Sequence, residues 1–224
     1  LTSAYSTFVN GGKKIFPIMI DRIQDRRGKT IYNADKRKCI TCEQISYLSD
    51  QVPKIEDNFE QIISPETAYQ MISMLEGVVQ RGTGRKLKHL NLNLAGKTGT
   101  TNNNTDTWFI GFTSKLVVGI YVGFDEPASL GRYETGAKTA MPIFKKFILN
   151  NISKQDATPF KVPDGIVMMV VDPITGQKVD FNSKNSIYES FKGKKMSEIN
   201  IENNYNDLIF SNSNARIKEI IRFY

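Results

Sequence analysis

Long apolar runs are absent from this sequence of 224 residues, and cysteine, histidine and tryptophan are scarce. The longest apolar segments, 116–122 and 165–171, fall well short of the ~18 residues that a membrane-spanning helix requires. The first residues lack the basic start and the apolar stretch of a signal peptide. Because residue 1 is Leu rather than Met, we expect a piece of a longer protein, with any membrane anchor or targeting segment upstream.

The overall composition is that of a globular protein. Hydrophobic residues make up 40% and charged residues 24% of the chain, which excludes wholesale disorder and the collagen-like and coiled-coil classes. The net charge of +7 is modest. Basic residues gather between positions 22 and 38, but acidic residues lie among them and no RNA-binding signature follows. We therefore predict a solvated basic face and no nucleic-acid partner.

The two cysteines, Cys39 and Cys42, admit three interpretations. A zinc site needs about four ligands, and His89 is the only histidine. A thioredoxin-type redox motif requires a βαβ context that the flanking residues do not indicate. The favoured interpretation is a staple within a loop, oxidised outside the cytoplasm and free in a reducing compartment. No metal or cofactor is predicted.

Apolar periodicity predicts an α+β domain in which helices cover an antiparallel sheet. In the first part of the chain it indicates a short helix over 1–10, strands at 15–20 and 30–32, and a long loop over 33–60. Ser64 and Pro65 are typical of a helix start, and apolar residues at helical spacing follow them. The next predicted elements are a strand over 90–94 that runs into 95–100, strands at 107–113 and 116–124, and a helix at 139–150.

We place a domain boundary near residue 150, with the α+β domain over 1–150 and a C-terminal extension of β and irregular structure over 151–224. Residues 166–171 read as a strand of this extension. From Asn182 the composition is that of a loop or tail, and 217–224 is predicted as a short terminal helix.

The stretch Gly96-Lys97-Thr98-Gly99-Thr100 carries the chemical signal. A phosphate-binding P-loop would need a glycine five residues before Gly96, where this sequence has Asn91. Lys-Thr-Gly is also a motif of serine enzymes that are acylated by penicillin. On a strand, Thr98 and Thr100 would point the same way, so that two hydroxyls and the charge of Lys97 could hold a carboxylate. Gly99 would allow a ligand close to the backbone, and the Thr100 N–H could donate to an oxyanion.

This motif stands within a series of blocks that resembles the C-terminal half of the transpeptidase domain of class A penicillin-binding proteins. These proteins are bifunctional glycosyltransferase–transpeptidases that build bacterial peptidoglycan, and the resemblance covers roughly residues 1–175. The blocks are, in chain order, residues 1–12, 77–84, 94–101, 106–113, 121–125 and 140–147.

The resemblance implies roles for particular residues. Lys97 and Thr100 would be the catalytic residues of the third active-site motif, with the Thr100 N–H as half of an oxyanion hole. Together with Thr98 and Gly99 they would bind the C-terminal carboxylate of a D-Ala-D-Ala stem peptide or of a β-lactam. Asp106, Trp108 and the turn 82–84 would support the strand. The resemblance also implies the upstream half of the same domain as a partner, and a site at the periplasmic face of the bacterial inner membrane.

Two motifs that the family needs are missing. No serine in the chain has a lysine three residues on, so the Ser-x-x-Lys nucleophile is absent. The one Ser-x-Asn, at 183–185, follows Lys97 and is in the wrong order. We therefore expect the second half of a catalytic domain, inactive alone and with apolar faces exposed. The alternatives are a D,D-carboxypeptidase or β-lactamase relative, or a non-catalytic remnant or binding module with the same half-fold.

Overall fold

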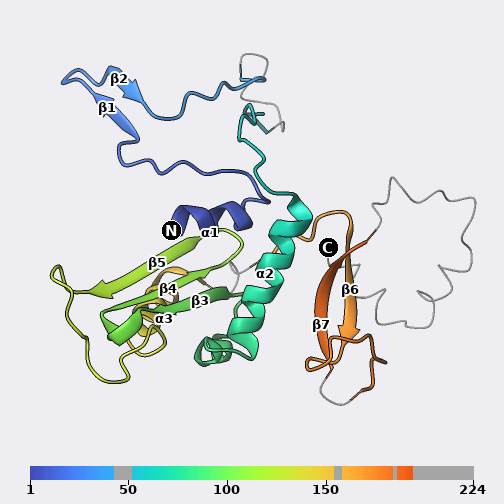
Figure 1. The fold of residues 1–224 in the computed structure, drawn as a ribbon. Coiled ribbons are helices and arrows are strands. Elements are labelled where there is room, and N and C mark those ends of the chain that lie inside the picture. Colours follow the sequence, from blue (N-terminus) through green and yellow to red (C-terminus); the bar gives the residue numbers. More distant parts are fainter. Residues whose placement is uncertain (43–51, 154–157, 184–185, 194–224) are drawn as a thin grey trace, which may run out of the picture. The chain divides into compact units, whose positions relative to one another are not determined.

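The computed structural model divides the chain into two compact units, Leu1–Pro163 and Asp164–Tyr224 (Figure 1). It describes the chain in four stretches, residues 1–42, 52–153, 158–183 and 186–193. Within these stretches no helix is both long and apolar enough to cross a membrane.

The first unit is built around an antiparallel sheet of three strands, in the order β3–β4–β5. Their bounds are β3 Ala95–Thr100, β4 Asp106–Phe112 and β5 Val117–Gly123. Apolar and aromatic residues dominate the last two strands, and a tight turn joins them, with the Thr113 N–H donating to the Leu116 carbonyl at 2.9 Å. Among the described residues β3 pairs with β4 and with no second strand, so it forms an edge of the sheet.

One face of the sheet is covered by α3 (Ala140–Asn151). Phe109 of β4 and Phe144 of α3 are fully buried, and their ring centroids lie 5.0 Å apart. The core around this contact is formed by residues from several elements, namely Val79, Leu87, Leu90, Leu94, Phe109, Ala140, Met141, Phe144 and Ile148.

The opposite face meets α1 (Thr2–Val9), where the Tyr5 ring lies 6.5 Å from that of Phe112. At the edge of the sheet, α2 (Pro65–Gln80) contacts both β3 and α1. The Ser64 hydroxyl caps α2 by accepting from the Thr67 N–H at 3.3 Å. The α+β class with helices over an antiparallel sheet is thus confirmed.

The predicted strand at 90–94 is wrong. Residues Arg85–Leu90 form a 3₁₀ helix, η1, and Asn91 ends it in the left-handed region with φ 52°. Leu87, Leu90 and Leu94 are all buried in the core. Leu87 and Leu90 are three residues apart, which is one turn of the 3₁₀ helix, and this spacing outweighs the short alternation that had indicated a strand.

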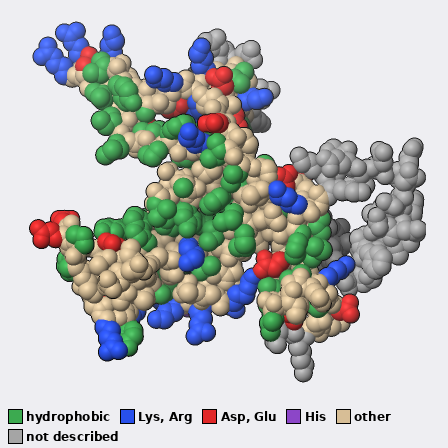
Figure 2. Space-filling view, viewed as in Figure 1, with side chains coloured by type: hydrophobic (Ala, Val, Ile, Leu, Met, Phe, Trp, Pro, Cys, Tyr) green, Lys and Arg blue, Asp and Glu red, His purple; other side chains and the backbone are tan. Residues whose placement is uncertain are grey.

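The predicted strand at 15–20 is also wrong. The strands in this region are β1 (Arg22–Gln24) and β2 (Thr30–Asn33), which pair as an antiparallel hairpin. Residues 15–20, which precede this hairpin, pair with no strand in the described part of the chain. Their apolar side chains are exposed, with Met19 at 99% and Ile18 at 59% of their surface. Figure 2 shows hydrophobic side chains on the surface in the region of β1 and β2. The apolar run therefore does not form a strand here, because none of the described residues pairs with it as a partner strand.

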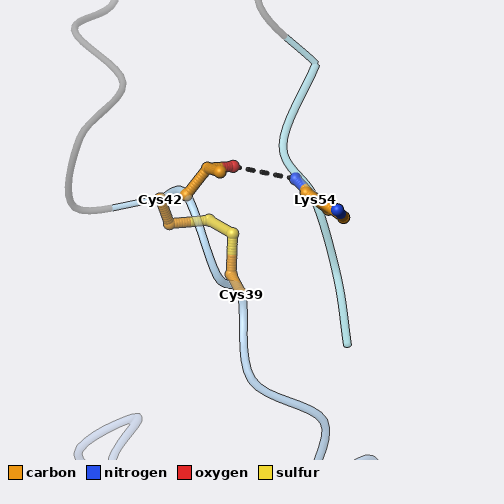
Figure 3. Close-up of a disulfide and its surroundings, with 4 residues drawn as sticks. Cys39, Cys42 and Lys54 are labelled. Atoms are coloured by element: carbon orange, nitrogen blue, oxygen red, sulfur yellow. Dashed lines mark hydrogen bonds between the residues drawn. A yellow bond between two sulfur atoms is a disulfide. The ribbon is translucent and has the colours of Figure 1, made fainter. Parts of the chain in front are cut away.

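Within the predicted long loop, Cys39 and Cys42 form a disulfide (Figure 3). The Lys54 N–H donates to the Thr41 hydroxyl at 2.9 Å and holds the two limbs of the loop together. Because both sulfurs are used in this bond, neither is available to a metal as the zinc interpretation requires.

The second unit contains a two-stranded antiparallel sheet of β6 (Ile166–Val171) and β7 (Ile187–Lys192). Strand β6 was predicted, but β7 was not, because its sequence lies in a stretch with the composition of a loop. Pairing with β6 across a long connection gives β7 its strand structure. The predicted helix at 217–224 lies outside the described residues.

Candidate functional site

The Lys-Thr-Gly-Thr motif forms the exposed part of the edge strand β3. Just after β3, the Thr101 N–H donates to the Asp106 carbonyl at 3.0 Å, which makes these two residues a hydrogen-bonded pair. Along an antiparallel ladder, hydrogen-bonded and non-hydrogen-bonded pairs alternate, so the pairs of Thr100 and Thr98 are of the second kind. Thr98 and Thr100, paired in register with Phe109 and Thr107, are therefore the residues whose N–H and C=O groups point away from β4. This geometry suits an extended ligand that adds to the sheet edge.

The hydroxyls of Thr98 and Thr100 lie on one face of β3, as predicted, because the residues alternate. The Thr98 hydroxyl is 3.0 Å from that of Thr83 in the 82–84 turn. The Thr100 hydroxyl accepts the Gly136 N–H at 3.1 Å. The structure therefore places the 82–84 turn in direct support of the motif, whereas the contact of Gly136 was not foreseen.

Lys97 and Gly99 lie on the other side of the strand. The Lys97 ammonium donates to the Thr98 carbonyl at 2.8 Å, and this keeps the charge beside the strand edge. A Cβ at Gly99 would lie 3.2 Å from the Cβ of Trp108, so a larger residue here would crowd the indole that backs the strand. The Trp108 ring in turn lies 4.9 Å from the Tyr121 ring.

Asp106 fixes the far end of the β3–β4 turn. Its carboxylate accepts from the Tyr121 hydroxyl at 2.6 Å and from the hydroxyls of Thr105 and Thr101 at 3.1 and 3.3 Å. These bonds, the one from Tyr121 foremost, lower the pKa of the Asp106 carboxyl. The carboxylate is thus held as an ionised structural acceptor, which agrees with a supporting position rather than a chemical one.

The missed residue, Gly136, lies in the loop between β5 and α3. In sequence it is one glycine in a small-residue stretch before a helix, and nothing local marks it as a neighbour of residue 100. Within the described part of the chain, no three His, Cys, Asp or Glu side chains gather in a way that would hold a metal ion. The site is therefore built from hydroxyls, backbone N–H groups and one ammonium, the donors that recognise an anion.

Comparison with known proteins identifies the family to which the chain belongs. Residues 1–149 match the family model described as penicillin binding protein transpeptidase domain. The chain therefore belongs to the penicillin-binding protein transpeptidase family.

The individual relatives are proteins named penicillin-binding protein 1A. That of Rickettsia bellii (strain RML369-C) is 42% identical over 218 residues, which cover 94% of this chain and 27% of the relative. That of Pseudomonas aeruginosa is 35% identical over 224 residues, covering 87% and 27%. The crystal structure of penicillin-binding protein 1A from Haemophilus influenzae is 32% identical, with a TM-score of 0.67, and the match covers 86% of this chain and 32% of that one. The predicted resemblance is confirmed, and the chain spans only about a quarter to a third of these relatives.

Proposed function

We propose that this chain supplies the carboxylate-binding strand of a bacterial peptidoglycan D,D-transpeptidase, which cross-links stem peptides through a serine acyl-enzyme and binds penicillin. The observation that carries the proposal is the edge strand β3. The N–H and C=O groups of Thr98 and Thr100 point away from β4, their hydroxyls lie on one face, and the Lys97 ammonium is held at the strand edge by the Thr98 carbonyl. Membership of the transpeptidase family supports the same activity.

In the proposed complex the ligand lies antiparallel or parallel to β3 and extends the sheet. Its terminal carboxylate accepts from the hydroxyls of Thr98 and Thr100, and Lys97 neutralises its charge. The carbonyl under attack points at the Thr100 N–H, which stabilises the oxyanion as the tetrahedral intermediate forms. This donor works without reorganisation because the ladder with β4 already fixes its direction.

The proposed reaction is acyl transfer. A serine oxygen attacks the carbonyl between the two D-alanines, the terminal D-alanine leaves, and an amine of a neighbouring stem peptide takes the acyl group. No Ser-x-x-Lys occurs among the 224 residues, so the nucleophile belongs to the upstream half of the domain. The isolated chain is therefore inactive in this proposal. The parent is a bifunctional enzyme that also carries a peptidoglycan glycosyltransferase and is anchored at the periplasmic face of the inner membrane.

Intact-mass measurement after incubation with benzylpenicillin tests the proposal. The 224-residue chain alone should gain no adduct, while the full-length protein that carries these residues should gain one per chain. In that protein Lys97→Ala should slow acylation by about tenfold to a hundredfold, because the ligand carboxylate loses a charged hydrogen-bonding partner. Lys115→Ala is the matched control, because Lys115 is an exposed lysine at the β4–β5 turn. An adduct on the isolated chain, or equal rates for the two variants, would contradict the proposal.

A further inference from the structure

The turn before α3 lies against the same face of the sheet as the motif hydroxyls and bonds to two strands. The Gly136 N–H donates to the Thr100 hydroxyl at 3.1 Å, and the Gly136 carbonyl accepts from the Met141 N–H at 2.8 Å. Thr107, which faces Thr100 in register on β4, has its hydroxyl 2.6 Å from that of Thr139. The turn therefore holds both members of the Thr100–Thr107 cross-strand pair.

Gly136 is packed so closely that no side chain fits. A Cβ there would overlap the Trp108 carbonyl oxygen and lie 2.7 Å from that of Gly99. Gly136 is buried, and its φ lies outside the range that favours glycine, so close approach alone requires glycine here. The backbone of the turn thus rests directly on the Gly99–Trp108 pair of the sheet.

This contact decides how the Thr100 hydroxyl is used. A threonine hydroxyl has one proton to donate and accepts through its lone pairs. Because the Gly136 N–H occupies the acceptor side of the Thr100 oxygen, the Thr100 proton is directed elsewhere. An anion on the strand edge needs a donor and is repelled by an oxygen lone pair, so this orientation suits a carboxylate.

We propose that Gly136 is a positioning residue that sets the Thr100 hydroxyl as a donor to the carboxylate of the ligand. The inference rests on the proposed function, because it assumes that a carboxylate binds at this strand. Gly136 acts through Thr100 and touches neither the ligand nor the reacting atoms. Thr139 supports the same arrangement. Its hydroxyl donates to the Thr135 carbonyl at 3.0 Å and lies 2.6 Å from the Thr107 hydroxyl, so it links the turn to Thr107.

The test compares two ligands that differ only in the carboxylate. Acylation rates of the full-length protein that carries these residues are measured with benzylpenicillin and with its methyl ester. Gly136→Ala should lower the ratio of the benzylpenicillin rate to the methyl-ester rate by about tenfold, because one charged hydrogen bond to the carboxylate is weakened. Lys138→Ala is the matched control, because Lys138 is an exposed residue of the same turn, and it should leave the ratio unchanged.

A second variant avoids the steric conflict of an added Cβ. Thr139→Val removes the hydroxyl that ties the turn to Thr107 and should lower the ratio in the same direction, whereas Thr139→Ser should restore it. In a Thr100→Val background neither Gly136→Ala nor Thr139→Val should change the ratio further, because both act through that hydroxyl.

The outcomes separate the two levels of the proposal. If the wild-type protein forms no adduct with benzylpenicillin, the proposed function fails. If it does form an adduct but the rates with the two ligands fall equally in Gly136→Ala and Thr139→Val, the positioning role of Gly136 is overturned and the turn is structural only. A further reduction of the ratio by Gly136→Ala or Thr139→Val in the Thr100→Val background would overturn it as well.

Discussion

A carboxyl group within the helix that supports the site makes the local stability of α2 depend on pH. Glu76 lies on α2 between the buried residues Leu75 and Gly77. Burial raises the pKa of its carboxyl to about 7 from an ordinary value of 4.5. Below about pH 7 the folded protein therefore favours the protonated form of Glu76.

The sign follows from proton linkage. Because the pKa of Glu76 is higher folded than unfolded, the folded state binds more protons between pH 4.5 and about 7. The stability that depends on Glu76 is fully present below pH 4.5, the unfolded value, and is lost as the pH rises through about 7, the folded value. The difference of 7 − 4.5 = 2.5 pKa units corresponds to a loss of at most about 3.5 kcal/mol of stability above pH 7, at ~1.4 kcal/mol per unit.

The perturbation is Glu76→Gln, which cannot ionise and keeps the shape of the side chain. At pH 8 it should raise the opening free energy of α2 by about 2–3 kcal/mol, and at pH 5 by less than about 1 kcal/mol. Hydrogen-exchange mass spectrometry of peptides from α2, corrected for the intrinsic exchange rate, measures this quantity. Glu126→Gln, an exposed acid in the loop after β5, is the matched control and should change little at either pH. An equal effect of Glu76→Gln at both pH values would refute the reasoning.

Two further predictions concern the sheet. Phe144→Ala should lower the free energy of unfolding by about 3–5 kcal/mol, because the ring is fully buried against Phe109 and its loss leaves a cavity; exchange protection of β4 reports it, and a loss below about 1 kcal/mol would contradict the packing. Asp106→Asn should destabilise the β3–β4 turn at neutral pH, because the lowered pKa of the Asp106 carboxyl reflects bonds that favour its ionised form. That difference should shrink as pH falls below the ordinary value of 3.8, and protection of the turn that is the same in both proteins at pH 7 would count against it.

The sequence predicted the parts of the fold whose signals are local. The start of α2 was predictable because Ser64 and Pro65 act within the first helical turn. The short turn between β4 and β5 follows from two apolar strands with a two-residue break between them. The strand predicted at 90–94 was wrong because its brief alternation begins at Leu90, which the structure places one 3₁₀ turn after Leu87; packing of these leucines in the core decides between the two patterns.

The candidate site was predictable in part for the same reason. Alternation along β3 places Thr98 and Thr100 on one face, and this needs no knowledge of distant residues. Gly136 could not be found, because its contact with Thr100 joins positions 36 residues apart and depends on how the loop before α3 folds back onto the sheet. Strand β7 was missed likewise, since its structure comes from pairing with β6.

The central claim is that these residues form part of the active site of a larger penicillin-binding enzyme. Labelling membranes of the native cells with fluorescent penicillin, and blotting the same gel with an antibody raised against this chain, tests it most directly. The account predicts a labelled band that the antibody recognises, far larger than the 25.3 kDa of this chain. An unlabelled band near 25.3 kDa, with no larger labelled one, would contradict it.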